Sequence, residues 1–238
     1  MAPLPAQPDE RPFHVHLTGF GPFGKHAVNP SWEAVKHLDG VVLSRSPDAL
    51  DGSTPTASSS SSPHRQIKLS ASLLPVSYTS CASLVPALHT PTSPPDLIIH
   101  VGVGLPGGVQ LEQRARKWGY EQPDVHGQLC AKVEKGRRGH AGDGANKLRT
   151  SVDGEKVLRA VKEKGVEKIE LSEDAGLYLC EFTYYLSLST ALSRNPSAPA
   201  PVQFVHVPPM GDTYWPAQLV HILKLVVWAI VNEGGLAS

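Results

Sequence analysis

The stretch DLIIHVGV, residues 96–103, is a continuous apolar run that opens at Asp96 and closes at a pair of glycines. A short apolar run bounded by turn signals predicts a fully buried β-strand. This strand is the clearest structural signal in the chain, and the interpretation of the fold starts from it.

Segments with strand and helix patterns alternate on both sides of this run. Strands are expected at 14–18, 67–78 and 203–207, and helices at 30–38, 84–88, 153–164, 180–192 and 216–231. Asn29 is a candidate N-cap for the first helix, because proline follows it at the first helical position. This alternation predicts an α/β fold around a mostly parallel sheet.

Composition excludes several classes of protein. The chain has 238 residues, with 22 basic and 22 acidic side chains, so we expect no nucleic acid or strongly charged partner. The proline-rich N-terminus lacks the apolar core of a signal peptide, and the most apolar segment, 219–231, is too short to span a membrane. Three cysteines at unrelated spacings predict neither disulfides nor a zinc site. We expect a soluble, cytoplasmic protein.

Two segments have compositions that disfavour a packed structure. Residues 1–12 are expected to form a disordered tail, and the serine-rich stretch 44–65 a disordered surface insertion, because such sequences bury too little apolar surface to offset ordering. Residues 136–146 are expected to form a further flexible loop.

Two glycine loops follow predicted strands. Residues 19–24 and 102–107 both fit G-x-G-x-x-G, so a nucleotide-binding oxidoreductase is one interpretation. Each loop contains proline, neither runs directly into a helix, and Asp39 is badly placed for a ribose contact. The alternative is that both are tight turns at the carboxyl edge of the sheet, where α/β proteins bind ligands. Phe20 and Phe23 then either staple the core or enclose a flat, uncharged ligand.

Histidines are frequent, so position decides their interpretation. His14 and His16 share one face of a strand without a clear third ligand, and we expect no metal there. His206 ends a predicted strand, and Glu112 follows the second glycine loop on the same edge of the sheet.

Cys180 stands between the loop DAG and an apolar, aromatic helix. A helix that begins there would direct its unpaired N–H groups at the sulfur, which favours a thiolate nucleophile. With His206 and Glu112 it would complete a Cys-His-carboxylate set. The alternative is an inert cysteine buried in a helix.

Four segments resemble the pyroglutamyl peptidase type I family of cysteine omega-peptidases, in its animal and fungal form. They are HLTGFGPFGKHAVNPSWEAVKHL at 16–38, VGVGLPGGVQLEQ at 101–113, SEDAGLYLCEFTYYLSL at 172–188 and FVHVPPMGDTYWPAQL at 204–219. They follow the order of that family. The sequence departs from the pattern of that family in two places. The segment between Gly102 and Glu112 is one residue shorter than usual, and Val103 stands where the family often has glutamine.

The resemblance implies one three-layer α/β/α domain over residues 1–238, without a cofactor. It also implies release of N-terminal 5-oxoproline from small peptides. Carried over by position, Cys180 is the nucleophile, His206 the general base and acid, and Glu112 the orienting carboxylate. Phe20 and Phe23 match the pair that encloses the lactam ring. A non-catalytic relative of the same fold remains an alternative, and the oligomeric state stays open.

Overall fold

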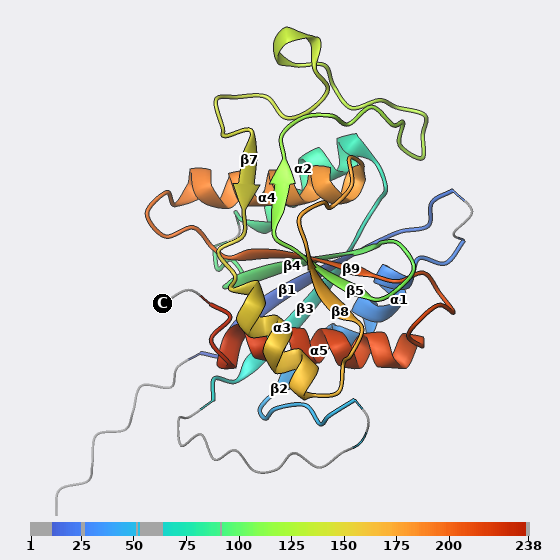
Figure 1. The fold of residues 1–238 in the computed structure, drawn as a ribbon. Coiled ribbons are helices and arrows are strands. Elements are labelled where there is room, and N and C mark those ends of the chain that lie inside the picture. Colours follow the sequence, from blue (N-terminus) through green and yellow to red (C-terminus); the bar gives the residue numbers. More distant parts are fainter. Residues whose placement is uncertain (1–10, 25–26, 51, 53–63, 91, 237–238) are drawn as a thin grey trace, which may run out of the picture.

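A central sheet of seven strands carries the fold, with strand order β2-β3-β1-β4-β9-β5-β8 (Figure 1). The computed structural model describes residues 11–24, 27–50, 52, 64–90 and 92–236. The strands are β1 (Phe13–Phe20), β2 (Val42–Leu43), β3 (Ile67–Leu74), β4 (Leu97–Val103), β5 (Val109–Glu112), β8 (Ile169–Ser172) and β9 (Val202–Val207). The stretch 96–103 is thus the middle strand of the sheet, with Asp96 just before it.

Most strand pairs are parallel, as the alternation of elements predicts. β1 pairs in parallel with β3 and β4, β4 with β9, and β5 with β8. Two pairs are antiparallel, namely β2 with β3 at one edge and β5 with β9 inside the sheet. The reversal at β5 matters for the site, because the first residue of β5 lies at the edge where β4 and β9 end.

Helices cover both faces of the sheet and make three layers (Figure 1). α2 (Tyr78–Leu88) and α4 (Leu179–Arg194) pack together on one face. α1 (Pro30–Val35), α3 (Gly154–Glu163) and α5 (Pro216–Asn232) lie on the other, and 3-10 turns cover Lys36–Leu38 and Glu134–Gly136. The predicted α/β fold with a mostly parallel sheet is confirmed. Among the described residues, no helix is long and apolar enough to cross a membrane.

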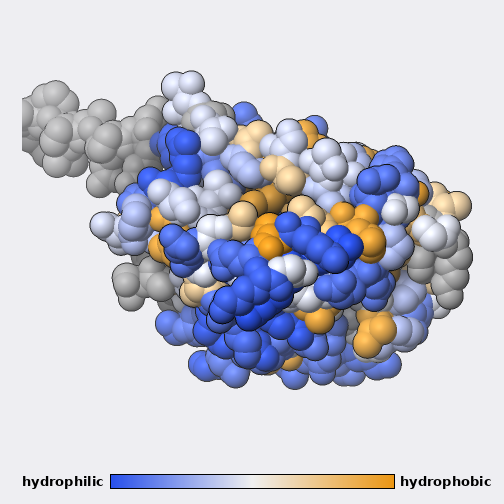
Figure 2. All heavy atoms as spheres, turned by 90° about the horizontal axis from the view of Figure 1, so that it is seen from above, coloured by the Kyte–Doolittle hydropathy of each residue, from blue (hydrophilic) through white to orange (hydrophobic). Residues whose placement is uncertain are grey.

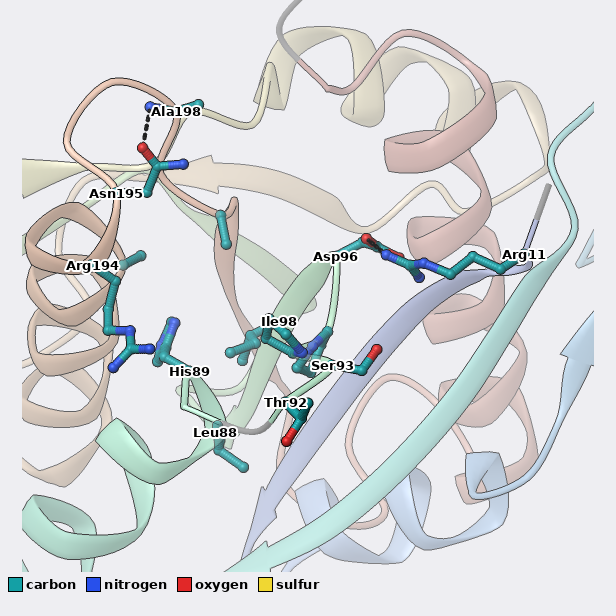
Figure 3. Close-up of a pocket in the computed structure, with 14 residues that line it drawn as sticks. Arg11, Leu88, His89, Thr92, Ser93, Asp96, Ile98, Arg194, Asn195 and Ala198 are labelled. Carbon is teal, nitrogen blue, oxygen red and sulfur yellow. Dashed lines mark hydrogen bonds and ion pairs between the residues drawn. The ribbon is translucent and has the colours of Figure 1, made fainter.

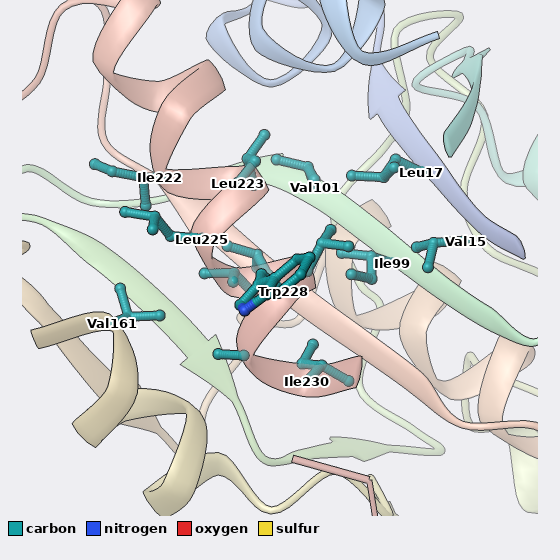
Figure 4. Close-up of a cluster of buried hydrophobic side chains, with 14 of the residues drawn as sticks. Val15, Leu17, Ile99, Val101, Val161, Ile222, Leu223, Leu225, Trp228 and Ile230 are labelled. Carbon is teal, nitrogen blue, oxygen red and sulfur yellow. The ribbon is translucent and has the colours of Figure 1, made fainter. Parts of the chain in front are cut away.

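Each face of the sheet has its own apolar core. On the α5 face, Trp228 is 1% exposed and lies among Leu17, Ile99 and Leu225 (Figure 4). On the α4 face, Phe20, Tyr184 and Phe204 belong to the second core. Burial of this apolar surface is the main force that holds the helices on the sheet.

Short polar signals set the helix starts. Asn29 accepts a hydrogen bond from the Ser31 amide at 3.1 Å and caps α1, as predicted. Asp153 caps α3 in the same way. The strand predicted over 67–78 ends at Leu74, since Ser77 caps α2 and the chain turns helical at Tyr78.

A small second sheet stands outside the main one. β6 (Arg114–Arg116) pairs with β7 (Lys147–Arg149) in antiparallel orientation. The segment between them, which includes the predicted loop 136–146, extends from this sheet at the top of Figure 1. The face seen in Figure 2 is mostly hydrophilic, with apolar side chains in small separate patches.

The disorder predicted for 44–65 is wrong for residues 44–50. Ala49 is buried, and the amide of Leu50 donates to the carbonyl of Lys164 at 2.8 Å. The ring of His221 hydrogen-bonds the carbonyl of Asp48 at 2.7 Å. The stretch as a whole is polar in composition, but its apolar residues Ala49 and Leu50 pack against the core. Residues 51 and 53–63 of this segment lie outside the described residues.

The predicted N-terminal tail, 1–12, also extends too far. Arg11 donates to both carboxylate oxygens of Asp96, at 2.7 and 2.5 Å. Pro12 leads directly into β1. The tail prediction is therefore wrong for these last two residues, and residues 1–10 lie outside the described part of the chain.

Candidate active site

Cys180 is the second residue of α4, at the helix end that faces the carboxyl edge of β4. The N-cap residue Tyr178 makes no side-chain capping bond, and the first intrahelical bond runs from the Phe182 amide to the Tyr178 carbonyl at 3.0 Å. The earlier amides of the turn therefore have no intrahelical acceptor, and the positive end of the helix dipole lies beside the sulfur. Cys180 is partly exposed, whereas Cys81 and Cys130 are buried.

The second glycine loop makes room for this sulfur. A Cβ atom on Gly102 would lie 2.8 Å from Cys180 Sγ and 2.9 Å from the Phe204 ring. A Cβ atom on Gly104 would lie 2.9 Å from His206 Cβ. The two glycines that suggested a phosphate loop thus allow the thiol and the imidazole to approach the end of β4.

His206 and Glu112 meet on adjacent strands. β5 runs antiparallel to β9, with Gln110 opposite His206 and Glu112 opposite Phe204. The Nδ1 atom of His206 lies 2.8 Å from Glu112 Oε1, and the Glu112 carboxylate is fully buried. In this contact, Nδ1 carries the proton and donates a hydrogen bond to the carboxylate, which leaves Nε2 for other partners.

The His206 environment favours the charged imidazolium. Burial lowers the pKa of His206, but the negative charge of Cys180, a hydrogen bond to Cys180 and the Glu112 carboxylate raise it to about 9. The attractive interactions therefore outweigh desolvation.

Two residues that the sequence analysis missed hold Glu112 in place. The hydroxyl of Tyr184 and the Nε2 of Gln203 both donate to the Glu112 carbonyl at 2.9 Å. Tyr184 lies on α4, and Gln203 on β9. A buried glutamine inside an apolar strand is the one signal that could have marked this support, because buried amides need partners.

A small apolar pocket opens beside Cys180. It is lined by Phe20, Phe23, Asn29, Val76, Val103, Tyr178, Leu179 and Cys180. Phe20 is also 3% exposed and part of the core, so its ring packs in the core and lines the pocket at the same time. Asn29 is held by its own hydrogen bonds, since Nδ2 donates to the Gly21 carbonyl at 2.9 Å.

Comparison with known proteins places this chain in a family. A sequence model described as "Pyroglutamyl peptidase" matches residues 13–57. Pyroglutamyl-peptidase 1 of Rattus norvegicus is 35% identical over 219 residues, which cover 90% of this chain and 87% of the relative. The protein of the same name from Homo sapiens gives the same identity and coverage. The chain belongs to the pyroglutamyl peptidase family.

Solved structures agree with the fold of this family member. A mutant pyrrolidone carboxyl peptidase from Pyrococcus furiosus superposes with a TM-score of 0.71 at 20% identity, covering 91% of this chain and 97% of that one. Pyroglutamyl peptidase I of Bacillus amyloliquefaciens gives a TM-score of 0.70 at 24% identity, covering 93% and 97%.

The first glycine loop of this family member also serves packing. A Cβ atom on Gly19 would lie 2.7 Å from the Cα atom of Trp32, so glycine lets α1 approach β1 closely. In both loops, glycine is thus required where another element packs against the end of a strand. Of the two interpretations of these loops, strand-exit turns agree with the structure.

His14 and His16 are engaged in hydrogen bonds along one face of β1. His14 Nε2 and His16 Nδ1 contact Ser70 Oγ at 2.7 and 2.8 Å, and His16 Nε2 contacts Ser72 Oγ at 2.8 Å. Among the described residues, no three His, Cys, Asp or Glu side chains lie together in a way that could hold a metal ion.

A separate cavity lies at the opposite edge of the sheet, where α2 and α4 end (Figure 3). Several of its polar residues have partners: Asp96 pairs with Arg11, Asn195 Oδ1 accepts from the Ala198 amide at 3.2 Å, and His89 Nε2 bonds Ser187 Oγ, which does not line the cavity, at 2.9 Å. None of the three candidate catalytic residues lines it.

Proposed function

We propose that the chain removes the N-terminal pyroglutamyl residue from peptides, with Cys180 as nucleophile, His206 as general base and acid, and Glu112 as the carboxylate that orients the imidazole. The observation that carries this proposal is the 2.8 Å contact of His206 with buried Glu112, on the same imidazole that interacts with Cys180. A thiol, an imidazole and a carboxylate in this order are the elements of a cysteine hydrolase.

In the first step, the Cys180 thiolate attacks the carbonyl carbon that joins pyroglutamate to the next residue. The carbonyl oxygen becomes an oxyanion, which the uncapped amides at the start of α4 would stabilise. His206, as the imidazolium, donates its proton to the departing amine. The peptide leaves with a free N-terminus, and the pyroglutamyl group remains as a thioester on Cys180.

In the second step, neutral His206 accepts a proton from water, and the hydroxide attacks the thioester carbon. The second oxyanion collapses, and Cys180 leaves as a thiolate beside a regenerated imidazolium. Glu112 is expected to accept the hydrogen bond from Nδ1–H throughout, so that Nε2 faces the reacting atoms. The cycle consumes one water molecule and requires no cofactor.

The pocket of Phe20 and Phe23 suits the substrate ring. Pyroglutamate is a closed lactam without charge, and apart from Cys180 the residues that line the pocket are apolar, aromatic or amide side chains. Flat aromatic faces favour such a ring, and the absence of a charged partner disfavours a free ammonium group.

The deciding experiment is the release of a fluorophore from a pyroglutamyl amide, with and without a thiol-blocking reagent. Turnover that the reagent abolishes supports the proposal. A stable fold with no turnover would favour a non-catalytic relative. A titration with a dinucleotide, read by fluorescence, tests the oxidoreductase alternative in the same preparation.

We also propose a cellular compartment and partners for the protein. Cys81, Cys130 and Cys180 are all free thiols, which fits a reducing compartment such as the cytoplasm. The partners are small peptides that begin with pyroglutamate. Balanced charge favours neither nucleic acid nor an anionic membrane surface.

A further inference from the structure

The functional residues follow a fixed order along the carboxyl edge of the sheet. The ring pocket lies over β3 and β1, where Val76 and Phe20 contribute to its wall. Cys180 stands over Gly102 on β4, the next strand. His206 is the penultimate residue of β9, the strand after that. The edge therefore presents pocket, thiol and imidazole in this sequence.

This order gives the direction of a bound peptide. On the proposed function, the ring occupies the pocket, the scissile carbonyl lies at Cys180, and the departing nitrogen must lie within reach of His206 to receive its proton. The rest of the peptide then extends past β9, over the loops that follow β4 and β9. These loops are residues 104–108 and 208–213.

The two loops are joined and lie side by side. The amide of Gly104 donates to the Val207 carbonyl at 2.9 Å, which continues the pairing of β4 with β9. Further out, the amide of Gly107 donates to Asp212 Oδ2 at 2.8 Å. The Thr213 hydroxyl donates to the same oxygen at 2.7 Å, which holds Asp212 in place. The loops thus form one connected surface next to His206.

Two large apolar side chains are exposed on this surface. Leu105, directly after the glycine that packs against His206, is 76% exposed. Met210, four residues after His206, is 43% exposed. Each loses contact with water when an apolar group covers it, and the direction of the peptide brings the residue after pyroglutamate to this place.

We propose that Leu105 and Met210 form the binding site for the side chain of the residue that follows pyroglutamate, and that they favour a large aliphatic side chain there. This inference rests on the proposed function. It assigns to the two loops a role in substrate selection that is separate from the bond-breaking residues.

The test compares pyroglutamyl-leucine amide with pyroglutamyl-glycine amide, by detecting the amine released. The measured quantity is the ratio of the two kcat/KM values, for the parent protein and for Leu105→Ser, Met210→Ser and the double variant. Leu192→Ser is the matched control, because Leu192 is also 43% exposed but lies at the far end of α4. Both tested side chains are surface residues, so their removal should leave the fold intact.

The parent protein should prefer leucine. An open surface discriminates less than an enclosed pocket, where one methylene is worth about tenfold or more, so we expect each single variant to lower the ratio about threefold and the double variant about tenfold. Cleavage of the glycine substrate should stay within about twofold in all variants. Leu192→Ser should leave the ratio unchanged.

Three results would overturn the inference. A parent ratio near one, with both substrates cleaved, removes the proposed preference but leaves the proposed function standing. An equal loss on both substrates would mean that the loops support the fold or the imidazole instead. A change of association state in the variants, seen by light scattering, would assign the surface to a second copy of the chain. Cleavage of neither substrate by the parent protein would refute the proposed function itself.

Discussion

Arg116 on β6 holds the carboxylate of Glu181, the residue next to Cys180, through Nε at 2.8 Å and Nη2 at 2.7 Å. The backbone amide of Arg116 donates to the same carboxylate at 2.7 Å. Arg116 Nη2 also pairs with Asp174, in the loop that leads to α4. One side chain therefore ties the first turn of α4 and the preceding loop to the small second sheet.

Replacement of Arg116 by methionine should destabilise the protein. Glu181 is 1% exposed, so the variant would leave a buried carboxylate without its charged partner, at a cost of about 3 kcal/mol in the free energy of unfolding. Urea denaturation measures this change. Arg149→Met is the control, because the Arg149–Glu173 pair is exposed on both sides and should be worth no more than about 1 kcal/mol. Equal losses in the two variants would contradict the role given to the buried pair.

Glu112→Gln should lower turnover far more than it changes substrate binding. The variant keeps the shape of the side chain but removes the charge that supports the imidazolium, and comparable changes in serine proteases cost about 10⁴-fold in kcat. After Cys180, Glu112 is the other group that raises the pKa of His206, so the alkaline limb of the pH–rate profile should move to lower pH. Glu121→Gln, at an exposed position, provides the control. Near-parent turnover with an unmoved limb would refute the assignment of Glu112.

Alkylation should distinguish the three cysteines. Burial raises the pKa of both Cys81 and Cys130 to about 11, so these thiols stay protonated and enclosed near neutral pH. Iodoacetamide at pH 7.5 should therefore modify Cys180 first, and loss of activity should follow that modification. Mass mapping during inactivation checks this order. The variant Cys180→Ser should be nearly inactive, whereas Cys81→Ala and Cys130→Ala should stay active and sensitive to alkylation.

The ends of α4 and β9 that carry the site were predictable from the sequence, whereas the end of β3 and the start of α2 were not. Cys180 and His206 stand where apolar runs meet turn residues, and the structure has helix and strand ends there. β8 was missed because it is four residues long and only Ile169 of it is buried, so its place in the sheet is set by pairing with β5. The antiparallel entry of β5 into the sheet is likewise a tertiary property, and it is what brings Glu112 to His206.

The glycine loops show where local pattern fails. The spacing of the glycines alone cannot distinguish a phosphate-binding loop from the end of a strand that another side chain must approach closely. The approach of Cys180 to Gly102 depends on how α4 returns over the sheet, which no local window contains. The residues that support Glu112 through its carbonyl, Tyr184 and Gln203, were missed for the same reason.

Gly102→Ala should abolish activity while the fold persists. The added methyl group would lie 2.8 Å from Cys180 Sγ, so the thiol must leave its position against β4. Thermal unfolding checks that the variant folds, and turnover of a pyroglutamyl amide measures the loss. Retained turnover in a folded Gly102→Ala variant would show that the thiol does not need this position.

Stability should fall in mild acid, partly because of His140. His140 is 9% exposed and stacks on Phe182 and Tyr185, with ring centroids 4.2 and 4.8 Å apart. Burial lowers its pKa to about 4, from 6.5 for a free side chain. The unfolded chain therefore binds a proton that the folded protein does not, so the stabilisation is complete above pH 6.5 and declines as the pH falls toward 4.

At pH 5, this difference in proton binding amounts to about 2 kcal/mol for His140. His140→Phe keeps an aromatic ring in the stack but removes the titration. The free energy of unfolding should therefore drop less between pH 7.5 and pH 5 in this variant than in the parent protein. His126→Phe, at an exposed histidine of the same loop, controls for the change of residue type. Urea denaturation at the two pH values measures both slopes, and an equal drop in parent and His140→Phe would exclude His140 as a source of the acid sensitivity.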